Sequence, residues 1–257
     1  MKLVCAIALL AMASVTAAAA TVPLPRPRPA QAPLASTPVA PDARQTEEPP
    51  PPSACRLRLT EELAIAPSLP APMGTGECSV EDGVRLEAVV LADKTRVALT
   101  PPAIMRCTFA EAIVQWVRAD VAPTVRPLGA RLKSLDNYAA YDCRGRNNIV
   151  GAKLSEHGKA NALDVRSVKL ADGTVVALTD PQVSKDLREG LRKTTCARFT
   201  TVLGPGSDGY HEDHVHVDLA ERHGGYRMCQ WEVREPGMEL AASAVPLPRP
   251  RPANLKP

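Results

Sequence analysis

Three of the five histidines in this 257-residue chain lie within six positions, in the segment HEDHVHVDL at residues 211–219. If residues 214–219 form a β-strand, His214, His216 and Asp218 point to one face and the intervening apolar residues to the other. Neighbouring imidazoles on a strand that an apolar face anchors are suited to metal binding or proton transfer. The alternative is a pair of surface histidines on an edge strand.

A second segment, SEHGKANALDV at residues 155–165, places His157 seven positions before Asp164, at the start of an apolar stretch. We expect this stretch to be a strand beside the first motif. His157, Asp164 and a histidine of the first motif then supply three nitrogen or oxygen ligands. That number is typical of catalytic zinc, which keeps a position open for water. The leftover His223 is interpreted as an ordinary surface residue.

Together, the two segments resemble the signatures of a group of zinc peptidases, in which S-x-H is followed after six residues by D and later by H-x-H. The group includes D-Ala-D-Ala carboxypeptidases, penicillin-insensitive murein endopeptidases, lysostaphin-type enzymes and the hedgehog amino-terminal domain. From about Cys55 to Cys229 the chain more closely resembles the bacterial extensin-like C-terminal domain family, through SEH…A-x-D, CARFTTVLGPGSD, H-x-DHVHVDL and GGYRMC.

The resemblance implies a role for each part of the site. An open zinc site suits amide hydrolysis, because zinc ionises a water near neutral pH and polarises the carbonyl. In related peptidases an arginine clamps the substrate carboxylate or the oxyanion, and YDCRGRNN offers Arg144, which we prefer, and Arg146. A surface arginine beside a disulfide is the alternative. The implied zinc ligands are His157, Asp164 and His216, and the implied catalytic residues are His214, His211 and Arg144.

We therefore expect an exported zinc-dependent hydrolase that cleaves peptide bonds in peptidoglycan cross-links or stem peptides, as an endopeptidase or a carboxypeptidase. The alternative is a metal-containing module that binds the cell wall without catalysis, and a histidine cluster without metal is a third interpretation. The sequence has no HExxH, no G-x-S-x-G and no Gly-rich phosphate loop. The net charge of +3 is too small to indicate nucleic acid as a partner.

Two details near the implied ligands stay open in the sequence. The extensin-like family usually has glycine where this chain has Ala160. If the turn needs a positive φ there, alanine is strained by roughly 1–2 kcal/mol, unless Gly158 takes up the turn instead. Asp208, Asp213 and Asp218 are rival candidates to orient a ligand imidazole from outside the ligand shell. We expect at least two of the three simply to solubilise a loop.

The two ends of the chain differ in composition from its middle. Residues 1–20 have the short positive start, apolar run and small residues of a secretory signal peptide, which predicts export to the periplasm or beyond. Proline-rich arms at residues 21–53 and 236–257 both contain VPLPRPRPA. They are expected to be extended spacers or docking motifs for an envelope partner. The domain between them is predicted to span residues 54–235, without the ~20-residue apolar stretch of a transmembrane helix.

The cysteine count supports an oxidising compartment. Removal of Cys5 with the signal peptide leaves six of the seven cysteines, an even number that predicts disulfides without specifying their pairing. No two of them have the C-x2-C or C-x4-C spacing of a zinc knuckle. Trp116 and Trp231 are interpreted as core residues rather than as a platform for sugars.

The elements that must position the motifs indicate an α+β fold. We expect a small antiparallel sheet with helices packed on it, similar to hedgehog and D-Ala-D-Ala peptidase domains and held by disulfides. The expected strands are residues 132–141, 162–170, 174–178, 200–203 and 214–219. The second and third of them are joined by an Asp-Gly hairpin turn.

Two helices are predicted from their end signals. Thr108 and Glu111 form a capping box for an amphipathic helix that continues through Val121 and ends before Pro123. The dipeptide at residues 180–181, Asp-Pro, opens the second helix, because proline is tolerated at a first helical position.

Overall fold

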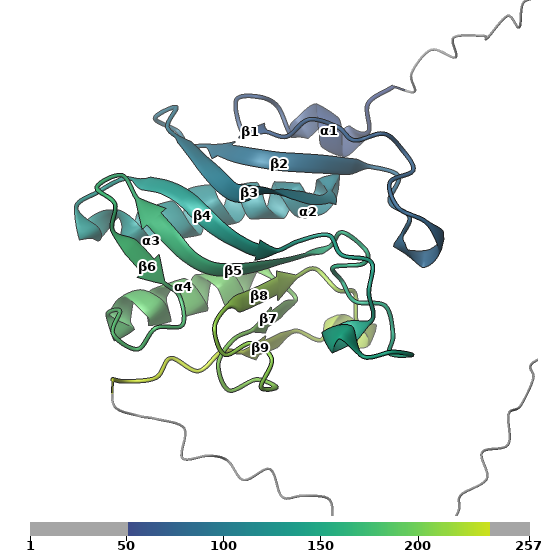
Figure 1. Ribbon diagram of the computed structural model, residues 1–257. Helices are drawn as coiled ribbons and strands as arrows, with labels where there is room; N and C mark the ends of the chain where they lie inside the picture. The colour runs from purple at the N-terminus through teal and green to yellow at the C-terminus, as the bar shows by residue number, and fades with distance from the viewer. Residues whose placement is uncertain (1–50, 237–257) are drawn as a thin grey trace, which may run out of the picture. The chain divides into compact units, whose positions relative to one another are not determined.

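The computed structural model describes residues 51–236, and the strands within them join in one nine-stranded sheet (Figure 1). The strand order is β1-β2-β3-β4-β5-β8-β7-β9, with β6 paired to β5 off this path. The predicted signal peptide and nearly all of both proline-rich arms lie outside the described residues. The strands are β1 (Ala64–Ile65), β2 (Gly83–Val90), β3 (Arg96–Arg106), β4 (Leu132–Ala139), β5 (Ala162–Leu170), β6 (Val175–Ala177), β7 (Thr201–Leu203), β8 (Val215–Asp218) and β9 (Met228–Gln230).

The fold is α+β, as predicted, but the expectation of a small antiparallel sheet is wrong. The sheet is large and mixed, because β3 pairs with β4 and β7 pairs with β9 in parallel. Parallel neighbours need a crossover connection, and residues 107–128 supply one as a run of helix between β3 and β4. All five predicted strands are present as β4 to β8, and the Asp-Gly turn does join β5 to β6. No strand was predicted for the long β2 and β3.

Both predicted helices exist, but neither begins as expected. Arg106 is the N-cap of the first helix and makes no side-chain cap, so the Thr108 capping box is wrong. This helix also continues past the expected stop, because Pro123 lies in the first turn of α3, where its missing N–H costs little. The second helix begins after Ser184, whose hydroxyl accepts from the N–H of Leu187, and not at residues 180–181. The helices are α1 (Ala54–Arg58), α2 (Cys107–Trp116), the π-helical η2 (Val117–Val121), α3 (Ala122–Val125) and α4 (Lys185–Arg198), with 3-10 turns η1 (Gly76–Cys78), η3 (Arg126–Leu128), η4 (Arg146–Asn148) and η5 (His223–Gly225).

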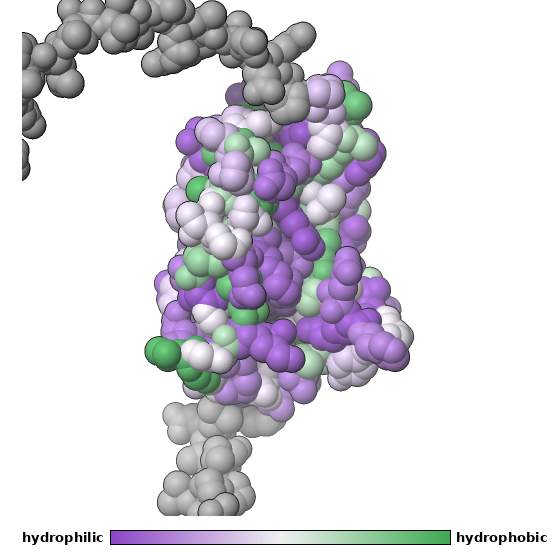
Figure 2. All heavy atoms as spheres, turned by 90° about the vertical axis from the view of Figure 1, so that its right-hand side faces the viewer, coloured by the Kyte–Doolittle hydropathy of each residue, from purple (hydrophilic) through white to green (hydrophobic). Residues whose placement is uncertain are grey.

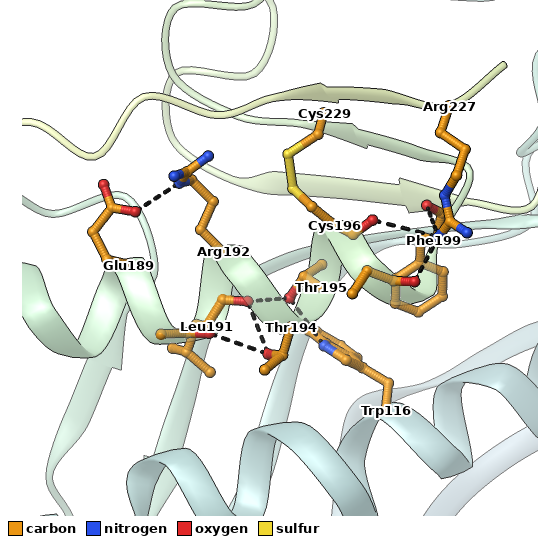
Figure 3. Close-up of a disulfide and its surroundings, with 12 residues drawn as sticks. Trp116, Glu189, Leu191, Arg192, Thr194, Thr195, Cys196, Phe199, Arg227 and Cys229 are labelled. Atoms are coloured by element: carbon orange, nitrogen blue, oxygen red, sulfur yellow. Dashed lines mark hydrogen bonds and ion pairs between the residues drawn. A yellow bond between two sulfur atoms is a disulfide. The ribbon is translucent and has the colours of Figure 1, made fainter.

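The core lies between one face of the sheet and the helices α2 and α4 (Figure 1). Trp116 of α2 is buried and its indole N–H donates to the hydroxyl of Thr195 in α4 at 3.0 Å (Figure 3). Trp231 is also buried, so both tryptophans are core residues, as predicted. Val215 and Val217 of β8 belong to this core. By the alternation of a strand, the histidine between them points to the opposite face.

All six cysteines within residues 51–236 form disulfides, which confirms the prediction. Figure 3 shows the pair Cys196–Cys229, which ties the end of α4 to β9 beside an Arg227 side chain that donates to the carbonyls of Ala197 and Phe199. Disulfides persist in oxidising compartments such as the periplasm or the extracellular space. Among residues 51–236 we find no helix with the length and apolar character needed to cross a membrane. The other pairs are Cys55–Cys107 and Cys78–Cys143.

Candidate metal centre

The two histidine motifs meet on the face of the sheet that α2 and α4 leave free. Strands β5 and β8 are antiparallel neighbours, and their register places Asp164 directly opposite His216. His157 comes from the loop before β5. Oδ1 of Asp164 lies 2.8 Å from Nδ1 of His216 and 3.3 Å from Nε2 of His157, and the two nitrogens are 3.2 Å apart. All three side chains are buried, so the sequence motifs converge on one closed cluster.

A second layer of hydrogen bonds holds the two imidazoles. Nδ1 of His157 lies 2.6 Å from the carbonyl oxygen of Ala140, which only accepts, so Nδ1 carries the proton and Nε2 is free. Nε2 of His216 lies 3.0 Å from a carboxylate oxygen of Asp218. Asp218 in turn accepts from the hydroxyl of Thr201. Metal-binding histidines commonly have such partners, which set the tautomer and the orientation of the ring.

The cluster contains an ionised carboxylate that is buried. Burial alone would raise the pKa of Asp164, but the neighbouring imidazoles of His157 and His216 outweigh it and hold the pKa far below its usual range. Burial alone would lower the pKa of His216, but the carboxylates of Asp164 and Asp218 raise it to about 9. The protein therefore keeps a buried carboxylate ionised and balances it with a proton on His216, in the place that a metal cation would take.

The donor set fits zinc. Two imidazole nitrogens and one carboxylate oxygen, all within 4.8 Å of one another, match the three protein ligands of a catalytic zinc site. Among the described residues one other group of donors lies close together, formed by Cys55, Asp82 and Cys107. Its two cysteines are joined in a disulfide and offer no thiolate.

Zinc binding should release a proton from His216. Its pKa of about 9 means that the ring is protonated at pH 7, whereas Nδ1 must be unprotonated to bind a metal. We expect about one proton released per zinc near pH 7 and an affinity that falls about tenfold per pH unit below pH 9. Calorimetric titration in two buffers of different ionisation enthalpy measures this number. Binding without proton release would show that His216 is already neutral.

His214 stands beside the ligand cluster and has its own support. Its Nε2 lies 3.6 Å from Oδ2 of Asp164, while its Nδ1 lies 2.8 Å from Oδ1 of Asp213. The other oxygen of Asp213 accepts from Arg166 at 3.1 Å. The guanidinium of Arg166 stacks 3.6 Å from the ring centre of Tyr138, and that ring packs against His214 at 4.9 Å. Together these contacts fix the ring of His214 so that its Nε2 points toward the cluster.

His211 is the third imidazole at the site. Its ring centre lies 5.1 Å from that of His214 and 5.5 Å from that of His216, and its Nδ1 is 2.7 Å from Oδ1 of Asp208. Burial lowers the pKa of His211, against the effect of Asp208. The ring is therefore neutral at pH 7, with Nδ1–H donated to Asp208 and Nε2 able to accept a proton. His223 is exposed on η5 and takes no part.

Each candidate aspartate serves a different histidine. Asp208 holds His211, Asp213 holds His214 and Asp218 holds His216, so the expectation that at least two merely solubilise a loop is wrong. The sequence also gave no role to Arg166 or Tyr138. Arg166 follows Asp164 by two positions on the same strand face, a signal that was available. Tyr138 carried none, because a β-bulge in β4 between residues 137 and 139 decides its direction.

The site opens into a cavity of about 680 Å³, a typical size for a ligand site. The loop of residues 140–161 forms one wall and the loop of residues 204–214 the other. Both candidate arginines line the cavity, but Arg144 donates to Asp142 at 2.9 Å. Among the described residues Arg146 has no carboxylate partner. Figure 2 shows the side of the molecule from which the loop of residues 140–161 projects. Hydrophilic residues predominate along the middle of this face.

Residues 53–230, which include every residue of this site, match the model of the extensin-like protein C-terminus family. The chain belongs to this family. No curated protein matches the chain, and no solved structure matches it either. In the extensin-like domain of this chain, His211 and His214 therefore lie beside the cluster of His157, Asp164 and His216, and each of the two has its own aspartate partner.

The extensin-like domain of this chain has one strained residue in the turn between the first two candidate ligands. Ala160 has φ of 51°, in the left-handed region that favours glycine. Gly158 has an ordinary φ, and a side chain there would meet Leu154 at 2.5 Å, so the turn has not shifted onto it. The His157 cluster is nevertheless assembled around this alanine.

Ala160→Gly should stabilise the protein. Relief of left-handed strain, about 1–2 kcal/mol, exceeds the entropy that glycine adds to the unfolded chain, about 0.5–1 kcal/mol. We expect the free energy of unfolding in urea to rise by about 0.5–1 kcal/mol. The matched change Ala171→Gly, at an exposed residue without positive φ, should lower it. Equal destabilisation by both changes would show that Ala160 is unstrained.

Proposed function

We propose that this protein is an exported, zinc-dependent hydrolase of the bacterial cell envelope that cleaves peptide bonds in peptidoglycan. One observation carries the proposal: a buried His157, Asp164 and His216 cluster, suited to zinc, lies in a cavity beside the separately supported imidazoles of His214 and His211. The substrate class follows from the resemblance of the two motifs to zinc peptidases of the cell wall. Export follows from the signal-like residues 1–20 and is consistent with three disulfides.

Zinc would be held by Nε2 of His157, a carboxylate oxygen of Asp164 and Nδ1 of His216. When bound, it would supply an activated water at neutral pH and a Lewis acid for the scissile carbonyl. The remaining chemistry belongs to side chains around the cavity. Asp218 keeps the ring of His216 in place, and the carbonyl of Ala140 does the same for His157.

His214 is placed to move protons. Since Asp213 takes up its Nδ1–H, the lone pair at Nε2 faces the reaction centre and accepts a proton from the attacking water or returns one to the leaving amine. His211 is the neutral neighbour: its Nδ1–H is donated to Asp208, so its Nε2 accepts a hydrogen bond from water or from an N–H of the substrate. Arg146, which has no carboxylate partner among the described residues, is the better placed cation for a substrate carboxylate than the paired Arg144.

Asp213→Asn should slow the reaction without releasing zinc. The amide cannot accept the Nδ1–H of His214 and bind Arg166 as the carboxylate does, so the ring loses its tautomer and its aim. We expect kcat to fall about 10- to 100-fold with little change in KM or zinc content. Asp93→Asn, at an exposed turn of the β2–β3 hairpin, is the matched control and should have no effect. A loss confined to KM would contradict a role in proton transfer.

The proposal is tested by incubating the zinc-loaded mature chain with purified peptidoglycan and identifying soluble products by mass spectrometry. Peptides or muropeptides that appear with the protein and not with its His214→Ala variant support hydrolysis. If zinc is bound at one ion per chain and no product forms, the hydrolase proposal is wrong. In that case retention of the protein on sedimented cell walls would favour the non-catalytic wall-binding module.

A further inference from the structure

The floor of the cavity extends well beyond the ligands. In the sheet register, Ala139 of β4 lies opposite Asp164, Asp164 opposite His216, and His216 opposite Leu203 of β7. Two residues before Leu203 in β7, Thr201 pairs with Met228 of the edge strand β9. Residues of all five strands, β4, β5, β8, β7 and β9, line the same cavity. The floor therefore runs across the strands, with the candidate metal centre between its two ends.

The two loops that wall the cavity lie at opposite ends of the strands. Loop 140–161 leaves the sheet where β4 ends and β5 begins, at the right-hand end of these strands in Figure 1. Loop 204–214 joins β7 to β8 at the opposite end of the strands. Since β5 and β8 are antiparallel neighbours, the loops fold over the floor from opposite sides. We call this cavity, which has a floor of five strands and a loop at each end of the strands, the trench.

The length of the trench decides what fits in it. Neighbouring strands are about 4.8 Å apart, so the floor continues about 10 Å from β8 to β9 and about 5 Å from β5 to β4. An extended peptide advances about 3.3–3.6 Å per residue. On the β9 side the floor thus has room for about three residues. An enzyme that removes one terminal residue needs room for one residue beyond the scissile bond.

We propose that this trench binds a peptide that continues on both sides of the scissile bond, so that the protein cleaves cross-links and does not trim free carboxyl termini. The inference rests on the proposed hydrolase function and names its substrate class. The reaction consumes one water: the amide C–N bond breaks, a carboxylate forms on one peptide, and the other peptide leaves as an amine. The loop arginines then bind charges along the chain instead of a single terminal carboxylate.

The test offers two purified muropeptides to the zinc-loaded mature chain: a cross-linked dimer and an uncross-linked monomer with a complete pentapeptide. We expect the dimer to be cut to monomers with a kcat/KM at least about tenfold above that for loss of the terminal residue. Trimming of the pentapeptide at an equal or greater kcat/KM would overturn the inference and leave the hydrolase function intact. No cleavage of either by a zinc-loaded protein would remove the hydrolase function and the inference with it.

Met228→Trp tests the far end of the trench directly. A larger side chain at the edge strand should obstruct the peptide beyond the scissile bond and raise KM for the dimer about tenfold, with zinc content unchanged. Val175→Trp, on the exposed surface of β6 and outside the cavity, is the matched control and should cleave like the parent. An unchanged KM for the dimer in Met228→Trp would show that substrate does not reach β9.

Discussion

Replacing His157 and His216 together with alanine should eliminate zinc binding and peptidoglycan hydrolysis. The pair supplies two of the three donor atoms in the only described cluster with free metal ligands, and one carboxylate does not retain the ion. We expect the parent to contain about one zinc per chain, and the variant close to none, by mass spectrometry of metals. Hydrolysis should fall to background, because without zinc the carbonyl is not polarised and the water is not ionised at neutral pH.

Folding must be controlled in this experiment. The double variant leaves the buried Asp164 without either imidazole, and a buried charge that loses its partners destabilises a protein by several kcal/mol. The single variant His157→Gln, which keeps a polar side chain and the His216–Asp164 pair, is a milder companion and should also lose most of its zinc. His223→Ala, at the exposed histidine of η5, should retain zinc and activity. Full zinc content in a folded double variant would refute the ligand set.

The second large effect is expected from His214→Ala, which should slow turnover strongly and leave zinc in place. His214 contributes no donor atom to the cluster, and its Nε2 lies 3.6 Å from Asp164. Loss of a positioned acid or base costs about 10²- to 10⁴-fold in rate, so kcat/KM should fall by that factor. Zinc content, the disulfides and the melting temperature should match those of the parent.

His214→Gln sharpens the result, because glutamine fills a similar volume and forms hydrogen bonds but cannot carry the proton. If the role is proton transfer, the Gln variant should be as slow as the Ala variant. If the role is only to bind the oxyanion, Gln should recover part of the rate. Loss of zinc in both variants would mean that His214 is a ligand, and unchanged hydrolysis would exclude it from catalysis.

Much of the candidate centre was predictable because it depends on short-range geometry. Alternation along a strand places His214, His216 and Asp218 on one face whatever the rest of the fold does. The apolar residues between them bind the same strand to a core, and the stretch that follows Asp164 has the composition of a buried strand. The presence of disulfides and the α+β class therefore follow from local pattern and composition, whereas the choice of the three candidate ligands came from the resemblance to zinc peptidases.

The remaining features depend on contacts between segments that are distant in sequence. Whether Asp208, Asp213 or Asp218 supports a given histidine was undetermined, because all three lie near all three histidines along the chain and only the folded loop separates them. Tyr138 and Arg166 joined the site through a bulge and a strand pairing. The helical run that continues past Pro123 connects β3 to β4 and lets the two strands pair in parallel, so the sheet is mixed and not antiparallel as expected.

What the sequence determined by itself is the chemistry available: which imidazoles and carboxylates exist, and which of them share a strand face. Residue type and the two-residue period of a strand are local properties and survive any arrangement of the chain. What only the tertiary structure decided is the assembly: the pairing of each histidine with one aspartate, and the five-strand floor that carries the trench past β8 to β9. Strand order and loop packing arise from long-range contacts, and those contacts leave no fixed spacing in the sequence.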